Sequence, residues 1–132
     1  MKKLILFLVP LLAFGLILTG FNPQQNEANS DKKIVKGVDV VLTTVKDFKE
    51  LLENSPKERK KIHQFGKKIS EQWDVIEKQV EAKYPTDYQN IEESLYPLIA
   101  LSQEEEPYVK KILELSDQVI EKLALFKGKI SS

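Results

Sequence analysis

The sequence predicts an all-α protein: an up-down-up-down four-helix bundle that follows an N-terminal hydrophobic segment. Two observations support this fold class. Apolar residues recur at spacings of three and four in four successive stretches, and the connections between the stretches are short and contain proline. Amphipathic helices joined by short turns pack as an antiparallel bundle. With 132 residues, the chain has room for one compact domain.

The first 21 residues predict a signal peptide or a membrane anchor. Two lysines precede an apolar run over residues 4–18, and a basic start before such a run is typical of export signals. The run is short for crossing a hydrocarbon core, which favours a cleaved signal over an anchor. Phe21 stands where a lipoprotein would carry its lipidated cysteine, and the chain has no cysteine. We therefore expect an extracytoplasmic protein, secreted or anchored to the cell membrane.

A polar tether is expected over residues 22–30, and the bundle domain over residues 31–132. Ser30 is a candidate cap for the first helix. The inward stripe of this helix is Ile34, Val38, Val41, Val45, Phe48 and Leu52. Because the stripe is rich in β-branched residues and Gly37 weakens a helix, a strand is a local alternative. The helical spacing continues through both flanks, which favours the helix.

The second helix is predicted from its boundary and its stripe. Ser55 and Glu58 can form a capping box, with Pro56 at the first helical position, where its missing N–H costs nothing. The helix is expected to end near Tyr84. Its inward residues are Ile62, Phe65, Ile69, Trp73, Ile76 and Val80.

The third and fourth helices are predicted in the same way. Thr86 and Gln89 form a second candidate capping box, and Pro97 should kink the third helix or end it early. Pro107 is expected to begin the fourth helix and Gly128 to end it. The inward residues of the two helices are Tyr88, Ile91, Leu95 and Leu98, then Val109, Ile112, Val119, Leu123 and Phe126, with Ser116 as a small gap.

Composition argues against several classes of function. The 20 basic and 20 acidic residues balance, so no overall positive field favours nucleic acid. Cysteine is absent, and His63 is the single histidine; its basic neighbours predict a partly exposed surface residue. The five glycines form no phosphate loop. Lys60 stands where a di-iron Glu-x-x-His motif would need glutamate. We therefore expect no enzymatic activity.

One short pattern, aromatic-x-x-Ile-Glu, occurs twice, fifteen residues apart, beginning at Trp73 and at Tyr88. Positions i, i+3 and i+4 share one helix face, so each copy presents an aromatic ring, an isoleucine and a carboxylate together. Pro85 lies between the copies and bends the chain. The copies can therefore face each other from two consecutive antiparallel helices, and we expect both aromatic residues to pack in the core.

The carboxylates of this repeat and their neighbours are candidate ligands for a hard cation such as ferric iron or calcium. The candidate metal site consists of Glu77, Glu92, Asp74, Glu81 and the Tyr88 hydroxyl. Clusters that offer only oxygen ligands suit such cations. The alternative, which the sequence alone favours, is that these carboxylates are solvated flank positions that pair with Lys78 or with a lysine of a neighbouring helix.

The charges are also unevenly placed along the chain. Residues 57–68 hold six cations and one anion, and residues 104–106 are three glutamates. In an up-down bundle both segments lie at the same end, where they can offset each other. The alternative is that the basic end faces anionic lipid.

From about residue 65 to residue 125 the chain resembles the extracytoplasmic helical domain of bacterial high-affinity iron permeases. More weakly, it looks like the helical iron-binding lipoproteins that work beside them. The resemblance rests on Trp73-x-x-Ile76-Glu77-x-x-Val80, on Tyr84-Pro85-x-x-Tyr88-x-x-Ile91-Glu92-x-x-Leu95, and on the amphipathic final helix. It implies that Glu77 and Glu92 occupy the acidic positions of that domain.

Two departures limit what this resemblance implies. The transmembrane helices of the permeases, with their Arg-x-x-x-Glu signatures, are missing. So is the His-x-x-Glu motif of the lipoproteins, because Gly66 follows His63 at the third position. Transport activity is therefore not implied, and a metal site would have to be built from carboxylates.

The leading hypothesis from the sequence is a non-enzymatic, exported or membrane-tethered helical module that handles a metal ion. Its cofactor would be iron or another hard cation, and its partner a membrane permease or another membrane protein. The second hypothesis is a structural or interaction module that docks a membrane partner and binds no ligand.

Overall fold

The computed structural model describes residues 23–131, with side chains from residue 30 onward. This part of the chain forms helices α2 (Pro23–Asn54), α3 (Arg59–Lys83), α4 (Pro85–Ser102) and α5 (Val109–Ser131), and it contains no strand. The predicted all-α bundle is confirmed. The predicted signal or anchor over residues 1–21 lies outside the described residues.

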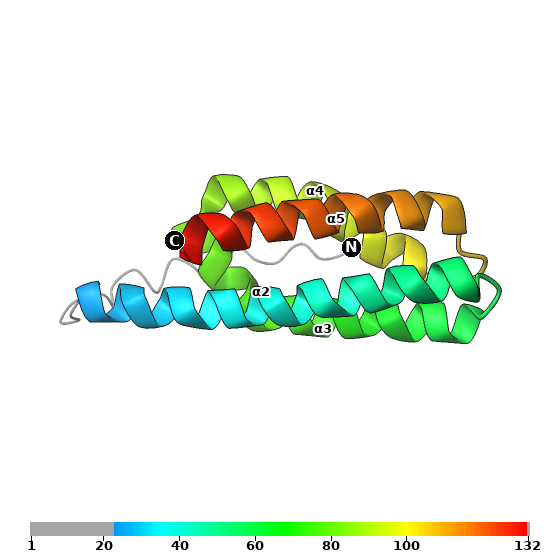
Figure 1. The fold of residues 1–132 in the computed structure, drawn as a ribbon, viewed down its shortest axis with the longest axis horizontal. Helices are drawn as coiled ribbons and strands as arrows, with labels where there is room; N and C mark the ends of the chain where they lie inside the picture. Colours follow the sequence, from blue (N-terminus) through cyan, green and yellow to red (C-terminus); the bar gives the residue numbers. More distant parts are fainter. Residues whose placement is uncertain (1–22, 132) are drawn as a thin grey trace.

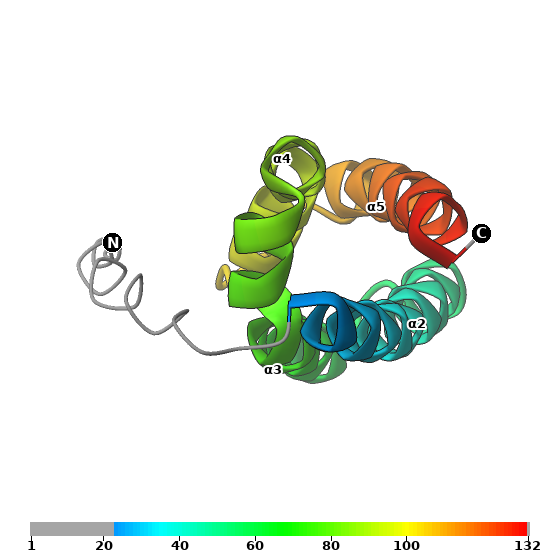
Figure 2. The same ribbon diagram turned by 90° about the vertical axis from the view of Figure 1, so that its left-hand side faces the viewer.

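The helices are arranged as a closed ring. The backbones of α2 and α3, α3 and α4, α4 and α5, and α5 and α2 lie next to each other, whereas those of the diagonal pairs lie farther apart. Figure 1 shows consecutive helices running in opposite directions, and Figure 2 shows all four around a common centre. None of the described helices combines the length and the apolar character that crossing a membrane requires.

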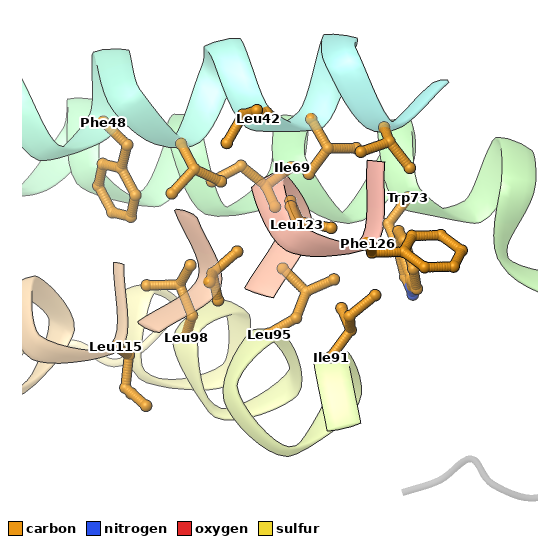
Figure 3. Packing of buried hydrophobic residues seen from close by; sticks show 14 of the residues in the cluster. Leu42, Phe48, Ile69, Trp73, Ile91, Leu95, Leu98, Leu115, Leu123 and Phe126 are labelled. Carbon is orange, nitrogen blue, oxygen red and sulfur yellow. The ribbon is translucent and has the colours of Figure 1, made fainter. Parts of the chain in front are cut away.

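The apolar stripes meet in one core along the axis of the ring (Figure 3). Every predicted inward residue of α2 is at most 1% exposed, so the helical interpretation of its β-branched stretch is confirmed. The predicted stripes of the other helices are also buried, except for three partly exposed residues at the margin of the core: Phe65, Tyr88 and Val109. The Phe48 and Phe65 rings stack with their centroids 5.3 Å apart.

The predicted helix starts are wrong by up to eight residues. Helix α2 begins at Pro23, so residues 23–30 of the expected tether are helical and Ser30 is not its cap. Proline is well suited to a first helical turn, and the glutamines that follow it favour a helix. Helix α5 begins at Val109, two residues after the expected Pro107.

The two predicted capping boxes do not form. Helix α3 begins at Arg59, and its cap, Glu58, makes no side-chain bond to the helix end. Residues 55–58 instead form the turn, in which the Glu58 N–H donates to the Ser55 carbonyl at 3.1 Å. Helix α4 begins at Pro85, directly after Tyr84, so the Thr86 and Gln89 pair lies inside it. Because the chain reverses direction within these few residues, they form backbone turns instead of side-chain caps.

The ends of α3, α4 and α5 fit the sequence-based expectations in part. Helix α3 ends at Lys83, next to the predicted Tyr84. Pro97 lies within α4 without ending it, and α4 continues to Ser102. The prediction that Gly128 ends the last helix is wrong, because α5 continues to Ser131. Nothing lies within 4 Å of a β-carbon built on Gly128, so this glycine is an exposed helix position.

The α4–α5 turn is tied to the start of α3. Arg59 Nη1 donates to the Glu105 carbonyl at 3.1 Å, and His63 Nε2 donates to the Glu104 carbonyl at 2.8 Å. The basic and acidic segments therefore lie at the same end of the bundle, as predicted, but these contacts use backbone carbonyls rather than carboxylates. His63 is partly exposed, as expected, and fastens this turn to α3.

Candidate functional site

The two copies of the repeat meet on the hairpin of α3 and α4, next to the turn at Tyr84. This residue alone separates the helices, and its side chain is held from two directions. Its hydroxyl donates to Asp31 of α2 at 2.7 Å, and its ring meets Phe126 of α5 edge to face at 5.3 Å. These contacts set where α4 begins, and so determine which residues of α4 lie opposite the repeat on α3.

The aromatic residues of the two copies stack, and each donates to the glutamate of the other copy. The Trp73 and Tyr88 rings are 6.4 Å apart and inclined by 10°. Trp73 Nε1 donates to Glu92 Oε2 at 2.7 Å, and the Tyr88 hydroxyl donates to Glu77 Oε2 at 2.8 Å. We call these four side chains the crossed clasp, because each hydrogen bond runs from one copy to the other.

Burial dominates the electrostatics of the crossed clasp. It raises the pKa of the Glu77 carboxyl, and repulsion from Glu92 and Asp74 raises this pKa further, against the stabilising Tyr88 hydroxyl. Burial likewise raises the pKa of Glu92, together with repulsion from Glu81 and Asp74, against the Trp73 donor. The pKa of Tyr88 is raised for the same reasons, first by burial and then by its bond to Glu77. Tyr88 is therefore a neutral donor.

Asp74 and Glu81 lie on α3 beside the crossed clasp and are exposed. Their charges act on the buried pair, which places all four candidate carboxylates on one face of the α3–α4 hairpin. Within the part of the chain that the structure describes, none of the four forms an ion pair. The ion pairs there lie elsewhere, for example between Lys49 and Asp117, Lys127 and Asp39, and Lys129 and Asp87.

For two of the four carboxylates, this arrangement corrects the alternative that the sequence favoured. Glu77 and Glu92 are half-buried rather than solvated, and their partners are aromatic donors rather than Lys78 or another lysine. The sequence identified Trp73 and Tyr88 as core residues, and Trp73 is indeed 3% exposed. Their role as hydrogen-bond donors was missed, although a buried indole or phenol normally finds an acceptor.

The hypothesis of a metal site stays a prediction. The structure brings Asp74, Glu77, Glu81, Glu92 and Tyr88 to one face, as expected. Among the described residues, however, no three acidic, histidine or cysteine side chains converge in a way that could hold a metal ion.

One aromatic residue on this face was not singled out from the sequence. Tyr96 is 57% exposed and follows Glu92 by one helical turn, which places it on the same side of α4. The sequence spacing of four residues from Tyr88 to Glu92 and from Glu92 to Tyr96 could have predicted this position. The α3–α4 face, defined as Asp74, Glu77, Glu81, Glu92 and Tyr96, is therefore acidic with an exposed aromatic side chain.

Comparison with protein-family models, curated proteins and solved structures finds no match to this chain. The likeness to iron-permease domains thus has no support beyond the residues that suggested it. Function has to be argued from the α3–α4 face itself.

Proposed function

We propose that this chain is a non-enzymatic, exported or membrane-tethered interaction module, and that its α3–α4 face docks a basic segment of a membrane partner. The observation that carries the proposal is the group of four carboxylates on this face, none of which forms an ion pair with a described residue. Elsewhere in the bundle, carboxylates such as Asp39 and Asp117 have a lysine partner within 3 Å.

The chemistry of the face favours lysine and arginine as the groups it receives. Asp74 and Glu81 are exposed and offer ion pairs, and Tyr96 offers a ring for a cation–π contact. Complementary charge accelerates encounter and selects the partner, even where each exposed ion pair adds little affinity. Export, and the membrane as the partner's location, rest on the basic and apolar residues that open the sequence.

Site-specific photo-crosslinking in the producing cell tests this proposal. A photoreactive phenylalanine analogue replaces Tyr96 on the α3–α4 face or, as a control, Leu125, which is 68% exposed on α5, the helix diagonal to α3. We expect a discrete crosslinked product from position 96 and none of that size from position 125.

A second comparison asks whether charge carries the interaction. Asp74→Asn/Glu81→Gln should reduce the crosslink from position 96 several-fold, whereas the matched change Glu50→Gln/Glu121→Gln removes two exposed carboxylates from α2 and α5 and should leave it unchanged. Equal crosslinking from positions 96 and 125, or equal yields from both double variants, would contradict the proposal.

A further inference from the structure

The outer side of α3 carries four charged side chains at intervals of seven residues. Two cations are followed by two anions: Lys60, Lys67, Asp74 and Glu81. Residues seven apart lie on the same side of a helix, with a drift of about 20° at each interval. All four side chains are exposed, and none forms an ion pair with a described residue. We call these four side chains the charge stripe.

The charge stripe is complementary to itself when two copies of α3 run antiparallel. Lys60 of one copy then lies opposite Glu81 of the other, and Lys67 lies opposite Asp74, because both pairs are symmetric about the point between residues 70 and 71. A two-fold axis through that point repeats each of the two pairs, which gives four ion pairs in total. A parallel arrangement would instead place like charges opposite each other.

An exposed aromatic side chain lies beside the midpoint of the charge stripe. Along the α3–α4 hairpin, Glu92 is level with Trp73, and Ser102 is level with Gly66. Tyr96, which is 57% exposed, lies between these two levels and therefore next to residues 70 and 71 of α3. In the antiparallel pair the two Tyr96 rings come together near the two-fold axis. Aromatic residues are enriched at protein interfaces, so this position suits the centre of a contact.

We propose that the basic segment received by the α3–α4 face is the first half of α3 in a second copy of this chain, paired antiparallel through the charge stripe. The inference rests on the proposed function, because it names the partner of the same face. A second copy carries the same N-terminal apolar segment and is therefore directed to the same place. The two α2 helices begin at opposite ends of such a dimer, so two tethered copies would lie with their helices along the membrane.

The charge stripe favours a reversible dimer over a permanent one. Exposed ion pairs each contribute little to affinity, and salt screens them. Association of free chains should therefore be weak and sensitive to salt. Attachment of both copies to one membrane would raise their effective concentration and favour the pair.

Photo-crosslinking of the purified full-length chain in a non-ionic detergent tests this pairing, because no other protein is present. The photoreactive phenylalanine analogue again replaces Tyr96. We expect a product of two chains whose yield falls as the salt concentration rises. Lys60→Glu/Lys67→Glu should lower the yield by at least about tenfold, because like charges then face each other across the interface. The matched control Lys61→Glu/Lys68→Glu reverses two exposed charges on the neighbouring side of α3 and should retain most of the yield.

Exchange of the charges between the two halves of the charge stripe provides the decisive comparison. Asp74→Lys/Glu81→Lys makes the charge stripe entirely basic and should also lower the yield. Mixing this variant with Lys60→Glu/Lys67→Glu, whose charge stripe is entirely acidic, should restore the product, because opposite charges again meet in every pair. A single chain with all four substitutions should restore it for the same reason. Circular dichroism checks that each variant is folded.

The inference is overturned if the purified chain with the analogue at position 96 and no other change gives no two-chain product. It is also overturned if Lys61→Glu/Lys68→Glu lowers the yield as much as Lys60→Glu/Lys67→Glu, or if neither the mixture nor the four-fold variant restores it. The proposed function fails on a different observation, the absence of a discrete product from position 96 in the producing cell. A cellular product of another size, without a two-chain product from the purified chain, would remove the second copy as the partner and leave the docking face in place.

Discussion

At Gly66 the backbone of α3 lies directly against the end of α4. A β-carbon on Gly66 would overlap the hydroxyl of Ser102, which is fully buried and donates to the Ile99 carbonyl at 2.7 Å. Gln103 strengthens the same junction by donating to the His63 carbonyl at 3.0 Å. The absence of a side chain at this position is therefore a packing requirement.

Two glycine-to-alanine changes separate packing from helix propensity. Gly66→Ala should lower the free energy of unfolding by about 1–3 kcal/mol, the typical cost of forcing extra atoms into a packed site. Gly128→Ala should raise it by about 0.5–1 kcal/mol, because that helical position is open and alanine loses less backbone entropy than glycine. Urea denaturation followed by circular dichroism measures both. A neutral Gly66→Ala would mean that the α3–α4 contact relaxes freely.

At the scale of the element, α4 shows that a proline need not interrupt a helix. Pro97 lacks the N–H that would bind the carbonyl of Glu93, yet α4 extends from Pro85 to Ser102 through it. Packing holds the helix together on both sides of Pro97, because Leu95 and Leu98 are fully buried. Contacts with α3 and α5 thus outweigh the missing hydrogen bond.

Pro97→Ala should therefore leave the fold intact and raise the free energy of unfolding by about 1 kcal/mol, because it restores one helical hydrogen bond. The measurement is a urea titration together with the far-ultraviolet circular dichroism spectrum of the folded state. A clear loss of stability would show instead that the backbone geometry imposed by proline is needed to seat α4 between its two neighbours.

At the scale of the whole molecule, the ring of four helices shares one core, so the bundle should unfold as a unit. Each helix packs against two others, and no helix has an apolar interior of its own. Most of the stability of helices in proteins comes from packing of the apolar face rather than from intrinsic helix propensity. Cooperative behaviour follows from this interdependence.

We expect residues 23–132 alone to form a soluble, helical domain that melts in a single transition. Within it, Ile76→Asp should abolish folding, because Ile76 is fully buried and an unpaired buried charge costs more than a small domain can lose. Val75→Asp is the matched control: this neighbour is 65% exposed and should tolerate the charge. Circular dichroism melts decide the outcome. A broad, gradual melt of residues 23–132, or equal effects of the two substitutions, would contradict a single core.

The periodic spacing of apolar residues determined the helices and their buried faces. In α2, the six residues expected to point inward are all buried, although four of them have β-branched side chains, which favour strands. The burial of one helix face depends on a repeat that is visible within a few turns of sequence. The repeat at Trp73 and Tyr88 likewise indicated correctly which two helices would bring the aromatic residues together.

Helix boundaries and side-chain partners were decided by the tertiary structure. Ser55 and Glu58 have the composition of a helix cap, but the reversal from α2 to α3 uses them as a turn. The spacing of Glu77 and Glu92 indicated a shared face, but not that Tyr88 and Trp73 would be their donors. A periodic pattern records which side of a helix is apolar. Which polar atoms meet across two helices depends on their relative register, and contacts from α2 and α5 to the turn at Tyr84 set that register in the folded bundle.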